Sequence, residues 1–150
     1  MEVLELKTAN EQKEWSDKIR NCDWGAAKFL ADLVEQEKFH ELLGDGSLYI
    51  MADGEKIVSF CTLTLRDCIK DDTLFPWIGF VFTAAEYRGN RYSGKLIDYV
   101  SNKAKEQGYK NVYIATDHIG LYEKYCFTYI ESRIDIYGEE GRIYLKNLKV

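Results

Sequence analysis

The segment Tyr87–Leu96 combines glycine, hydroxyl and basic side chains in a pattern that suits the binding of an anion. Arg88, Arg91 and Lys95 place three cations within eight residues that contain no acid. The apolar run Trp77–Phe82 precedes the segment and reads as a buried strand, and apolar residues at helical spacing follow it. A helix N-terminus has backbone N–H groups without internal partners and carries roughly half a positive charge. The sequence therefore predicts a strand, a short turn and a helix whose N-terminus binds an anionic ligand.

The composition indicates a globular protein rather than a membrane or nucleic-acid-binding one. The 150 residues are 46% hydrophobic and 30% charged, which predicts a single globular domain over residues 1–150. The net charge is −5, so the chain outside the three cations of the turn carries −8. A local positive charge on an acidic protein fits one bound anionic ligand and no nucleic acid. No apolar run approaches ~18–20 residues and no signal-peptide pattern is visible, so we expect a cytoplasmic protein without membrane contact.

The cysteines and histidines do not have the spacing of a metal site. Cys22, Cys61, Cys68 and Cys126 are scattered along the chain without a C-x-x-C pair, and only two histidines accompany them. We therefore expect free thiols and no bound metal.

Two classes of anionic ligand fit the turn. The spacing Gly89-x-x-x-x-Gly94-Lys95 is that of a nucleotide-binding P-loop, and Val112–Asp117 resembles a strand that ends in a metal-binding aspartate. However, Leu96 stands where a P-loop carries the Ser or Thr whose hydroxyl holds magnesium. The P-loop interpretation also accounts for nothing else in the chain.

The second class follows from a family resemblance. The run Arg88-Gly89-Asn90-Arg91-Tyr92-Ser93 resembles the pyrophosphate-binding signature of the GNAT N-acetyltransferases, Arg/Gln-x-x-Gly-x-Gly/Ala, which lies between the fourth strand and the next helix. Arg91 and Ser93 replace two small residues of that signature. Ser93 can still hydrogen-bond a phosphate or cap the helix. A glycine at position 91 would let the backbone lie close to the ligand, which Arg91 does not allow, but the guanidinium of Arg91 can bind a phosphate.

A second signature of the same family lies in the segment Asp117–Phe127. Its last seven residues are similar to the family's Leu-Tyr-Glu-Lys-x-Gly-Phe, with Cys126 at the usual glycine. The resemblance implies that the hydroxyl of Tyr122 points at the coenzyme sulfur and protonates the leaving thiolate. Reference pKa values of about 10 for tyrosine and about 8.5 for a thiol make that transfer uphill by only about 2 kcal/mol. A helix tyrosine packed on the sheet is the alternative interpretation.

The resemblance covers nearly the whole chain and implies acetyl-CoA as co-substrate, a primary amine as acceptor and direct transfer between them. In the family, the strand before the turn bulges and splays from its neighbour, and its free amides hold the pantetheine arm and the acetyl oxygen. Homodimers are frequent in the family and are an expectation here. A non-catalytic acyl-CoA-binding module is the alternative, because Arg91 and Cys126 stand at glycine positions. The residues expected to bind the coenzyme are Val81, Phe82, Thr83, Arg88, Gly89, Asn90, Arg91, Tyr92, Ser93, Gly94, Lys95 and Asp117.

The sequence does not assign the group that takes the proton of the amine. An ammonium of pKa ~10.4 costs nearly 5 kcal/mol to deprotonate at pH 7, so a base, an acidic guide or a water chain must help. The candidates are Asp67, Asp71 and Asp72 on the loop before the central strand and His118 at the end of the fifth strand, since histidine titrates near neutral pH. Glu139 or Glu140 could serve from the last hairpin. The residues expected on the acceptor side are Asp67, Asp71, Asp72 and Trp77. Acids on that side favour a small cationic amine as the acceptor. Peptide N-termini, lysines, polyamines and aminoglycosides all remain possible acceptors.

The elements that position these residues can be read from the hydrophobic pattern. We expect an α+β fold with a mixed, mostly antiparallel sheet of six to seven strands and helices on both faces. The expected strands are Val3–Leu6, Leu48–Met51, Lys56–Arg66, Trp77–Thr83, Asn111–Thr116, Phe127–Tyr137 and Arg142–Leu148. The expected helices are a region that begins at Asn10, is broken near Asn21–Gly25 and is ended by Gly44-Asp45-Gly46, then Ser93–Gln107 and Ile119–Tyr125.

Overall fold

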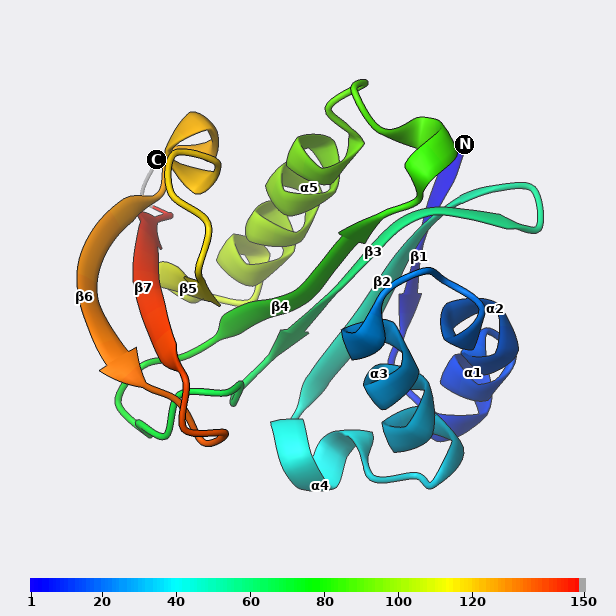
Figure 1. The fold of residues 1–150 in the computed structure, drawn as a ribbon, viewed down its shortest axis with the longest axis horizontal. Coiled ribbons are helices and arrows are strands. Elements are labelled where there is room, and N and C mark those ends of the chain that lie inside the picture. Colours follow the sequence, from blue (N-terminus) through cyan, green and yellow to red (C-terminus); the bar gives the residue numbers. More distant parts are fainter. Residues whose placement is uncertain (149–150) are drawn as a thin grey trace.

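The computed structural model describes residues 1–148 and contains one seven-stranded sheet in the order β1-β2-β3-β4-β5-β7-β6 (Figure 1). All neighbouring strands are antiparallel except β4 and β5, which are parallel. The predicted mixed, mostly antiparallel sheet is confirmed. The strands are β1 (Glu2–Leu6), β2 (Gly46–Asp53), β3 (Lys56–Thr64), β4 (Trp77–Thr83), β5 (Asn111–Thr116), β6 (Thr128–Ile134) and β7 (Glu140–Asn147).

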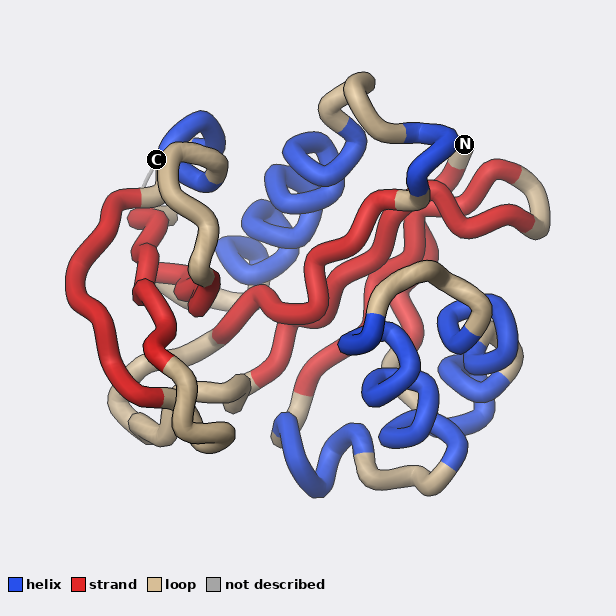
Figure 2. The backbone as a smooth tube through the Cα atoms, in the orientation of Figure 1, coloured by secondary structure: helices blue, strands red, loops and turns tan. Residues whose placement is uncertain are grey.

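Helices cover both faces of the sheet, as expected. The long helix α5 lies on one face, and four short helices lie on the other (Figures 1 and 2). The short helices are α1 (Ala9–Lys13), α2 (Ser16–Arg20), α3 (Gly25–Glu35) and α4 (Phe39–Leu43), and α5 spans Tyr92–Glu106. Two 3₁₀ turns, η1 (Ala85–Tyr87) and η2 (Tyr122–Tyr125), flank the sheet. None of the described helices is long and apolar enough to cross a bilayer.

The strand period of two divides the core between the two faces. In β2, Tyr49 and Met51 pack with α5, whereas Leu48 and Ile50 pack with the α1–α4 side. Because both faces are covered, β2 and β3 are buried at nearly every position and do not alternate between buried and exposed residues.

The N-terminal helical region is more fragmented than the sequence predicts. The predicted break near Asn21–Gly25 is present, but two further breaks occur, at Glu14–Trp15 and at 36–38. Glu37 has a left-handed backbone (φ 56°) that ends α3. The predicted helix Ile119–Tyr125 is reduced to the single turn η2, because Gly120 also has a left-handed backbone (φ 87°).

Candidate active site

Strand β4 is irregular on both of its edges. Along β3, Phe60 pairs with Phe82 and Thr62 pairs with Gly79, so two residues of β4 oppose one residue of β3. This is a β-bulge, and Phe80 within it has a left-handed backbone (φ 50°). Both the bulge and the splay described next are those that the family resemblance implies.

The other edge of β4 separates from β5. Among the described residues, the two strands pair at one position only, Trp77 opposite Tyr113. Beyond that point, the β5-facing edge of β4 has no strand partner, so its backbone N–H and C=O groups can pair with an extended ligand.

The N-terminus of α5 carries backbone donors that no side chain caps. Its N-cap is Arg91, which makes no side-chain capping bond, and the first helical bond runs from the N–H of Lys95 to the carbonyl of Arg91 (3.1 Å). The preceding N–H groups therefore have no partner within the helix. By contrast, α1 has a complete capping box formed by Thr8 and Glu11. An anion can fill the corresponding place at α5.

The turn before α5 is held in shape by its own side chains. Arg88 donates from Nε to the carbonyl of Thr83 (3.0 Å), and Asn90 donates from Nδ2 to the carbonyl of Tyr87 (3.2 Å). Gly89 has φ 85°, a conformation that glycine adopts without strain. The loop is thus ordered by internal hydrogen bonds.

Close packing explains why residue 94 is a glycine, and the P-loop interpretation does not explain this packing. A Cβ atom at this position would lie 2.5 Å from the ring of Tyr125, so the absent side chain lets α5 pack closely against η2. The residue that follows the first signature, Gly94, therefore contacts Tyr125 of the second signature. This contact places the N-terminus of α5 next to the turn that carries Tyr122.

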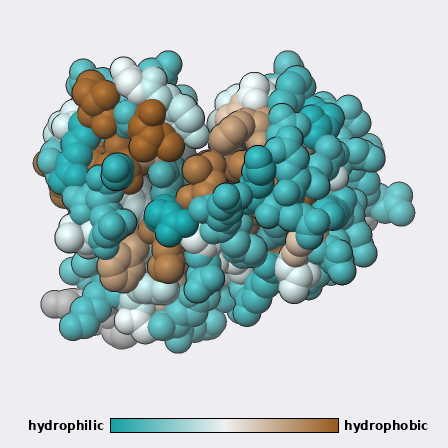
Figure 3. All heavy atoms as spheres, turned by 90° about the horizontal axis from the view of Figure 1, so that it is seen from below, coloured by the Kyte–Doolittle hydropathy of each residue, from teal (hydrophilic) through white to brown (hydrophobic). Residues whose placement is uncertain are grey.

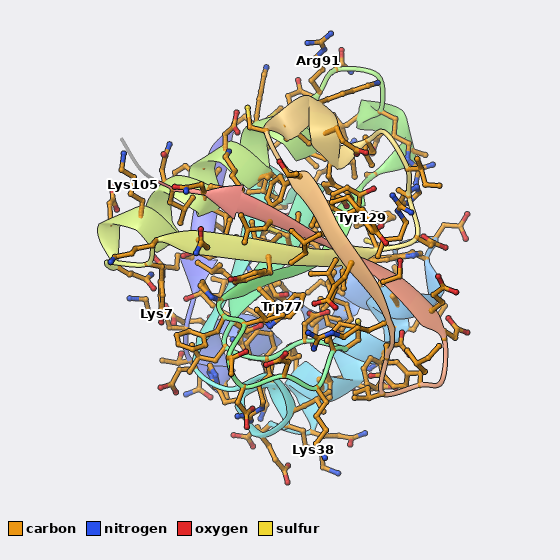
Figure 4. All side chains as sticks on the ribbon, turned by 90° about the vertical axis from the view of Figure 1, so that its left-hand side faces the viewer. Lys7, Lys38, Trp77, Arg91, Lys105 and Tyr129 are labelled. Atoms are coloured by element: carbon orange, nitrogen blue, oxygen red, sulfur yellow. The ribbon has the colours of Figure 1, made fainter. Side chains whose placement is uncertain are left out.

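Arg91 and Cys126 both have left-handed backbones, with φ values of 60° and 71°. Both stand where the resembled signatures have glycine, so each residue adopts a backbone conformation that glycine adopts more easily. The side chain of Arg91 points away from the body of the protein (Figure 4). With Lys95 and Lys124 it borders a hollow of about 440 Å³ beside α5.

Two neighbouring cavities lie along the splayed end of β4. The turn cavity, of about 450 Å³, is lined by residues that include Val81, Thr83, Arg88, Ser93, Leu121 and Tyr122. The splay cavity, of about 250 Å³, reaches between β4 and β5 and is lined by residues that include Gly79, Phe80, Ile114, Thr116 and Asp117. Trp24, Val81, His118 and Tyr122 line both cavities.

Tyr122 is buried at the wall that the two cavities share. It is 5% exposed and contacts the rings of Tyr125, Phe127 and Tyr144 at centroid distances of 6.1–6.4 Å. Burial, with a smaller contribution from Cys61, raises the pKa of its phenol well above the usual value. The hydroxyl is therefore protonated throughout the physiological range.

His118 follows β5 and is exposed at the same place. Its backbone N–H bonds Oγ1 of Thr116 (3.1 Å), and its carbonyl accepts a hydrogen bond from the hydroxyl of Tyr144 (3.2 Å). These bonds fix the backbone at the end of β5 and leave the imidazole at the border of the two cavities.

Asp67 is the sequence-predicted acid with the most unusual surroundings. Its Oδ1 is buried without a hydrogen-bond partner among the described residues, and it lies directly over Gly79. The pKa of this carboxyl is raised to about 6, chiefly by burial; hydrogen bonds from Cys68 act to lower it, and the nearby Asp135 acts to raise it. A partly neutral acid with one unpartnered oxygen beside the bulge is a candidate for contact with a cation.

The other residues predicted on the acceptor side have different roles. Asp71 forms an ion pair with Arg133 (2.6 Å), and its hydrogen bonds, first with Thr73 and then with Arg133, lower its pKa to about 2. Asp72 is exposed on the loop and lines none of the cavities described here. Trp77 is fully buried and donates from Nε1 to the carbonyl of Leu74 (2.7 Å), so it belongs to the core and not to an acceptor surface (Figure 4).

A third cavity adjoins the splay cavity on the side of Asp67. This aromatic cavity, of about 310 Å³, is lined by residues that include Trp24, Phe29, Asp67, Phe80, Asp135 and Tyr137. No pattern in the sequence indicates that Trp24, Phe29, Asp135 or Tyr137 belongs to a site. They come from the start of α3 and from the hairpin between β6 and β7, and no short motif links those segments.

Comparisons with known proteins agree with this geometry. A family model described as an acetyltransferase (GNAT) domain matches residues 9–130. The comparison with curated protein sequences returned no match.

Several solved structures share the fold at low sequence identity. An aminoglycoside 6'-acetyltransferase type Ii has a TM-score of 0.72 at 16% identity, covering 100% of this chain and 99% of its own. The aminoglycoside 6'-N-acetyltransferase of Enterococcus faecium has a TM-score of 0.69 at 13% identity, covering 100% and 98%. A GNAT acetyltransferase of Elizabethkingia anophelis with acetyl-CoA bound has a TM-score of 0.62 at 19% identity, covering 87% and 88%. The chain therefore belongs to the GNAT family of acetyl-CoA-dependent N-acetyltransferases.

Proposed function

We propose that this protein transfers the acetyl group of acetyl-CoA directly to a primary amine bound in the same complex. The observation that carries the proposal is the meeting of three features around the turn cavity. These features are the unpaired edge of β4, the uncapped N-terminus of α5 and the hydroxyl of the buried Tyr122. Each matches a different part of the donor: the pantetheine amides, the pyrophosphate and the sulfur.

The residues present fit coenzyme A at the phosphate end. The N–H groups before Lys95 are without helical partners, and Arg88, Arg91 and Lys95 supply positive charge around them. Charge-assisted hydrogen bonds of this kind hold phosphates in one orientation. Leu96 lies in the core and offers no hydroxyl for magnesium, so the same loop does not suit a magnesium nucleotide.

The chemistry follows from the positions of the strand amides and Tyr122. N–H groups at the bulge polarise the thioester carbonyl, and the neutral amine nitrogen attacks its carbon. The carbon–sulfur bond then breaks, and the hydroxyl of Tyr122 donates its proton to sulfur. One of the two protons that the original ammonium loses restores the phenol, and the other leaves to solvent. Because burial raises the pKa of Tyr122, donation is coupled to bond cleavage and does not precede it.

The first test is a thermal melt of the protein with acetyl-CoA, free CoA and magnesium-ATP in parallel. Ligand at ~100 times its Kd adds about 2.7 kcal/mol to the free energy of unfolding, which is several degrees in Tm. We expect a shift with both CoA species and none with ATP, followed by CoA release when an amine panel is added. A shift with ATP alone would overturn the proposal. CoA binding without turnover of any amine would identify the protein as an acyl-CoA-binding module.

A further inference from the structure

The walls of the aromatic cavity are unusually rich in exposed rings. Phe29 contacts Phe80 and Tyr137, each at a centroid distance of 6.3 Å, so three aromatic side chains form a continuous wall. Phe29 is 39% exposed and Tyr137 is 59% exposed. Exposed aromatic groups that border a cavity are better explained by ligand contact than by packing. In the view from below, apolar side chains border a hollow between the β6–β7 side and the helix side of the molecule (Figure 3).

The charge of the same cavity is negative. Asp67 and Asp135 line it, and no Lys or Arg is among the described residues that do so. Oδ1 of Asp135 is already used, because it accepts the backbone N–H groups of Tyr137 (2.9 Å) and Glu139 (3.0 Å). Oδ1 of Asp67 has no such partner among residues 1–148. A cation in the cavity would offset the repulsion between the two carboxylates.

The aromatic cavity also connects to the place of transfer. Trp24 and Phe80 line both the aromatic cavity and the splay cavity. Phe80 is the bulge residue, so a ligand lying on its ring has one end at the free edge of β4. Trp24 also lines the turn cavity, so one side chain borders all three cavities.

Resting on the transfer activity proposed above, we propose that the acceptor is a compact primary amine with an apolar, aromatic body that fills the aromatic cavity while its ammonium pairs with Asp67. A volume of about 310 Å³ is near the lower end of the ~300–1,000 Å³ usual for small-molecule sites. A polyhydroxylated aminoglycoside would place many hydroxyl groups against rings that cannot hydrogen-bond them. The cavity therefore selects against the acceptor class named for the two aminoglycoside acetyltransferases of similar fold.

The experiment measures binding and turnover separately. Calorimetric titration of the CoA-saturated protein compares 2-phenylethylamine with 2-phenylethanol, which keeps the ring and lacks the charge, and with ethylamine, which keeps the charge and lacks the ring. We expect each deletion to weaken binding by about tenfold or more. Turnover with acetyl-CoA then compares 2-phenylethylamine with kanamycin and spermidine.

Three variants test the assignment of the walls. Asp67→Asn removes the charge at nearly constant volume and should raise KM for 2-phenylethylamine by about tenfold or more. Tyr137→Ala removes an exposed ring and should also raise KM, with the Tm shift by acetyl-CoA retained in both variants. Asp72→Asn is the matched control, because it removes an exposed acid from the same loop and lines none of the described cavities. It should leave KM unchanged.

The outcomes separate this inference from the proposed function. If kanamycin is acetylated and 2-phenylethylamine neither binds nor reacts, the transfer activity stands and the aromatic acceptor site is wrong. If 2-phenylethylamine binds in an Asp67-dependent way but no amine is acetylated, the site stands and the transfer activity is wrong. Equal binding of 2-phenylethylamine and 2-phenylethanol would overturn the role of Asp67.

Discussion

The carboxylate of Asp67 occupies the space that a side chain at Gly79 would need. Gly79 belongs to β4 just before the bulge, so the absence of its side chain is what allows an acid to lie over the strand. Thr62 Oγ1, also buried and unpartnered among the described residues, would lie 3.2 Å from the same added Cβ. The glycine and the acid therefore form one structural unit.

A Gly79→Ala substitution should displace Asp67 and lower the free energy of unfolding by about 1–3 kcal/mol, as overpacking usually does. Denaturant unfolding of Gly79→Ala, Asp67→Ala and the double variant checks this. Because the methyl group fills the space of the missing carboxylate, the glycine substitution should cost less in the Asp67→Ala background. Strictly additive effects would contradict the contact.

The raised pKa of Asp67 makes stability depend on pH in a defined direction. Its folded pKa is about 6, against an ordinary 3.8, so the folded state binds the proton more tightly than the unfolded chain. The resulting stability is fully present below pH 3.8 and is lost as the pH rises through 6. Above pH 7 the buried charge costs about 3 kcal/mol.

The variant Asp67→Asn has no such charge. We expect it to unfold at a higher denaturant concentration than the wild type at pH 8 and at nearly the same concentration at pH 4. The exposed Asp72→Asn should show no pH-dependent difference. An Asp67→Asn difference that is equal at both pH values would mean that the carboxyl is not buried in its ionised form.

Much of this architecture follows from the sequence, because periodic apolar segments and the two signatures are local patterns. The strands around Trp77–Thr83 and the long helix after the turn have a clear period, and their limits agree with the structure within a few residues. The prediction for the helical region before β2 misses two of its breaks, because a break such as the one after α3 depends on a single residue, Glu37, adopting a left-handed backbone. The spacing of apolar residues does not indicate which residue adopts that conformation.

Most of the aromatic cavity could not be found in the same way. Asp67 is expected near the acceptor from the sequence, but Phe29 and Tyr137 are far from it in the chain, and only the packing of α3 and the last hairpin on β4 brings them to one cavity. Trp77 is expected on the acceptor side but lies in the core. The local sequence around an aromatic residue beside a predicted site is the same whether its ring faces a cavity or the core.

Loss of the hydroxyl of Tyr122 should impair transfer without impairing donor binding. In Tyr122→Phe we expect kcat to fall by about 10²–10⁴-fold, the usual contribution of a general acid. The ring contacts with Tyr125, Phe127 and Tyr144 remain, so the Tm shift by acetyl-CoA should be preserved. Tyr129→Phe, on the edge strand β6, is the control and should keep full kcat. Unchanged turnover in Tyr122→Phe would exclude it as the acid.

The close approach of α5 to η2 gives a prediction for Gly94. The methyl group of Gly94→Ala would overlap the ring of Tyr125, so we expect a loss of about 1–3 kcal/mol in the free energy of unfolding and a smaller Tm shift with CoA. Gly25→Ala, at the start of α3, is the control. Its Cβ would meet no atom within 4 Å, and alanine should stabilise the helix by up to about 1 kcal/mol. Similar losses in both variants would contradict this account.

The left-handed backbone of Cys126 predicts that glycine is the better residue there. A non-glycine residue at φ 71° costs about 1–2 kcal/mol, and glycine itself costs about 0.5–1 kcal/mol of chain entropy. Cys126→Gly should therefore raise the free energy of unfolding by up to about 1 kcal/mol. Cys126→Ala keeps the strain and should give no gain. Equal stabilities of the two variants in thermal or denaturant melts would show that the turn is not strained.

Two contacts join the last hairpin to the loop after β3. The carbonyl of Cys68 accepts the N–H of Ile136 (2.9 Å), and Asp71 pairs with Arg133. One wall of the aromatic cavity is thus a peripheral hairpin fastened to the scaffold, whereas the turn cavity is bordered by β4 and the start of α5. If the acceptor binds in the aromatic cavity as proposed, replacing the hairpin tip would alter which amine is accepted and leave the turn cavity intact. Acceptor specificity would then change by exchange of one exposed segment.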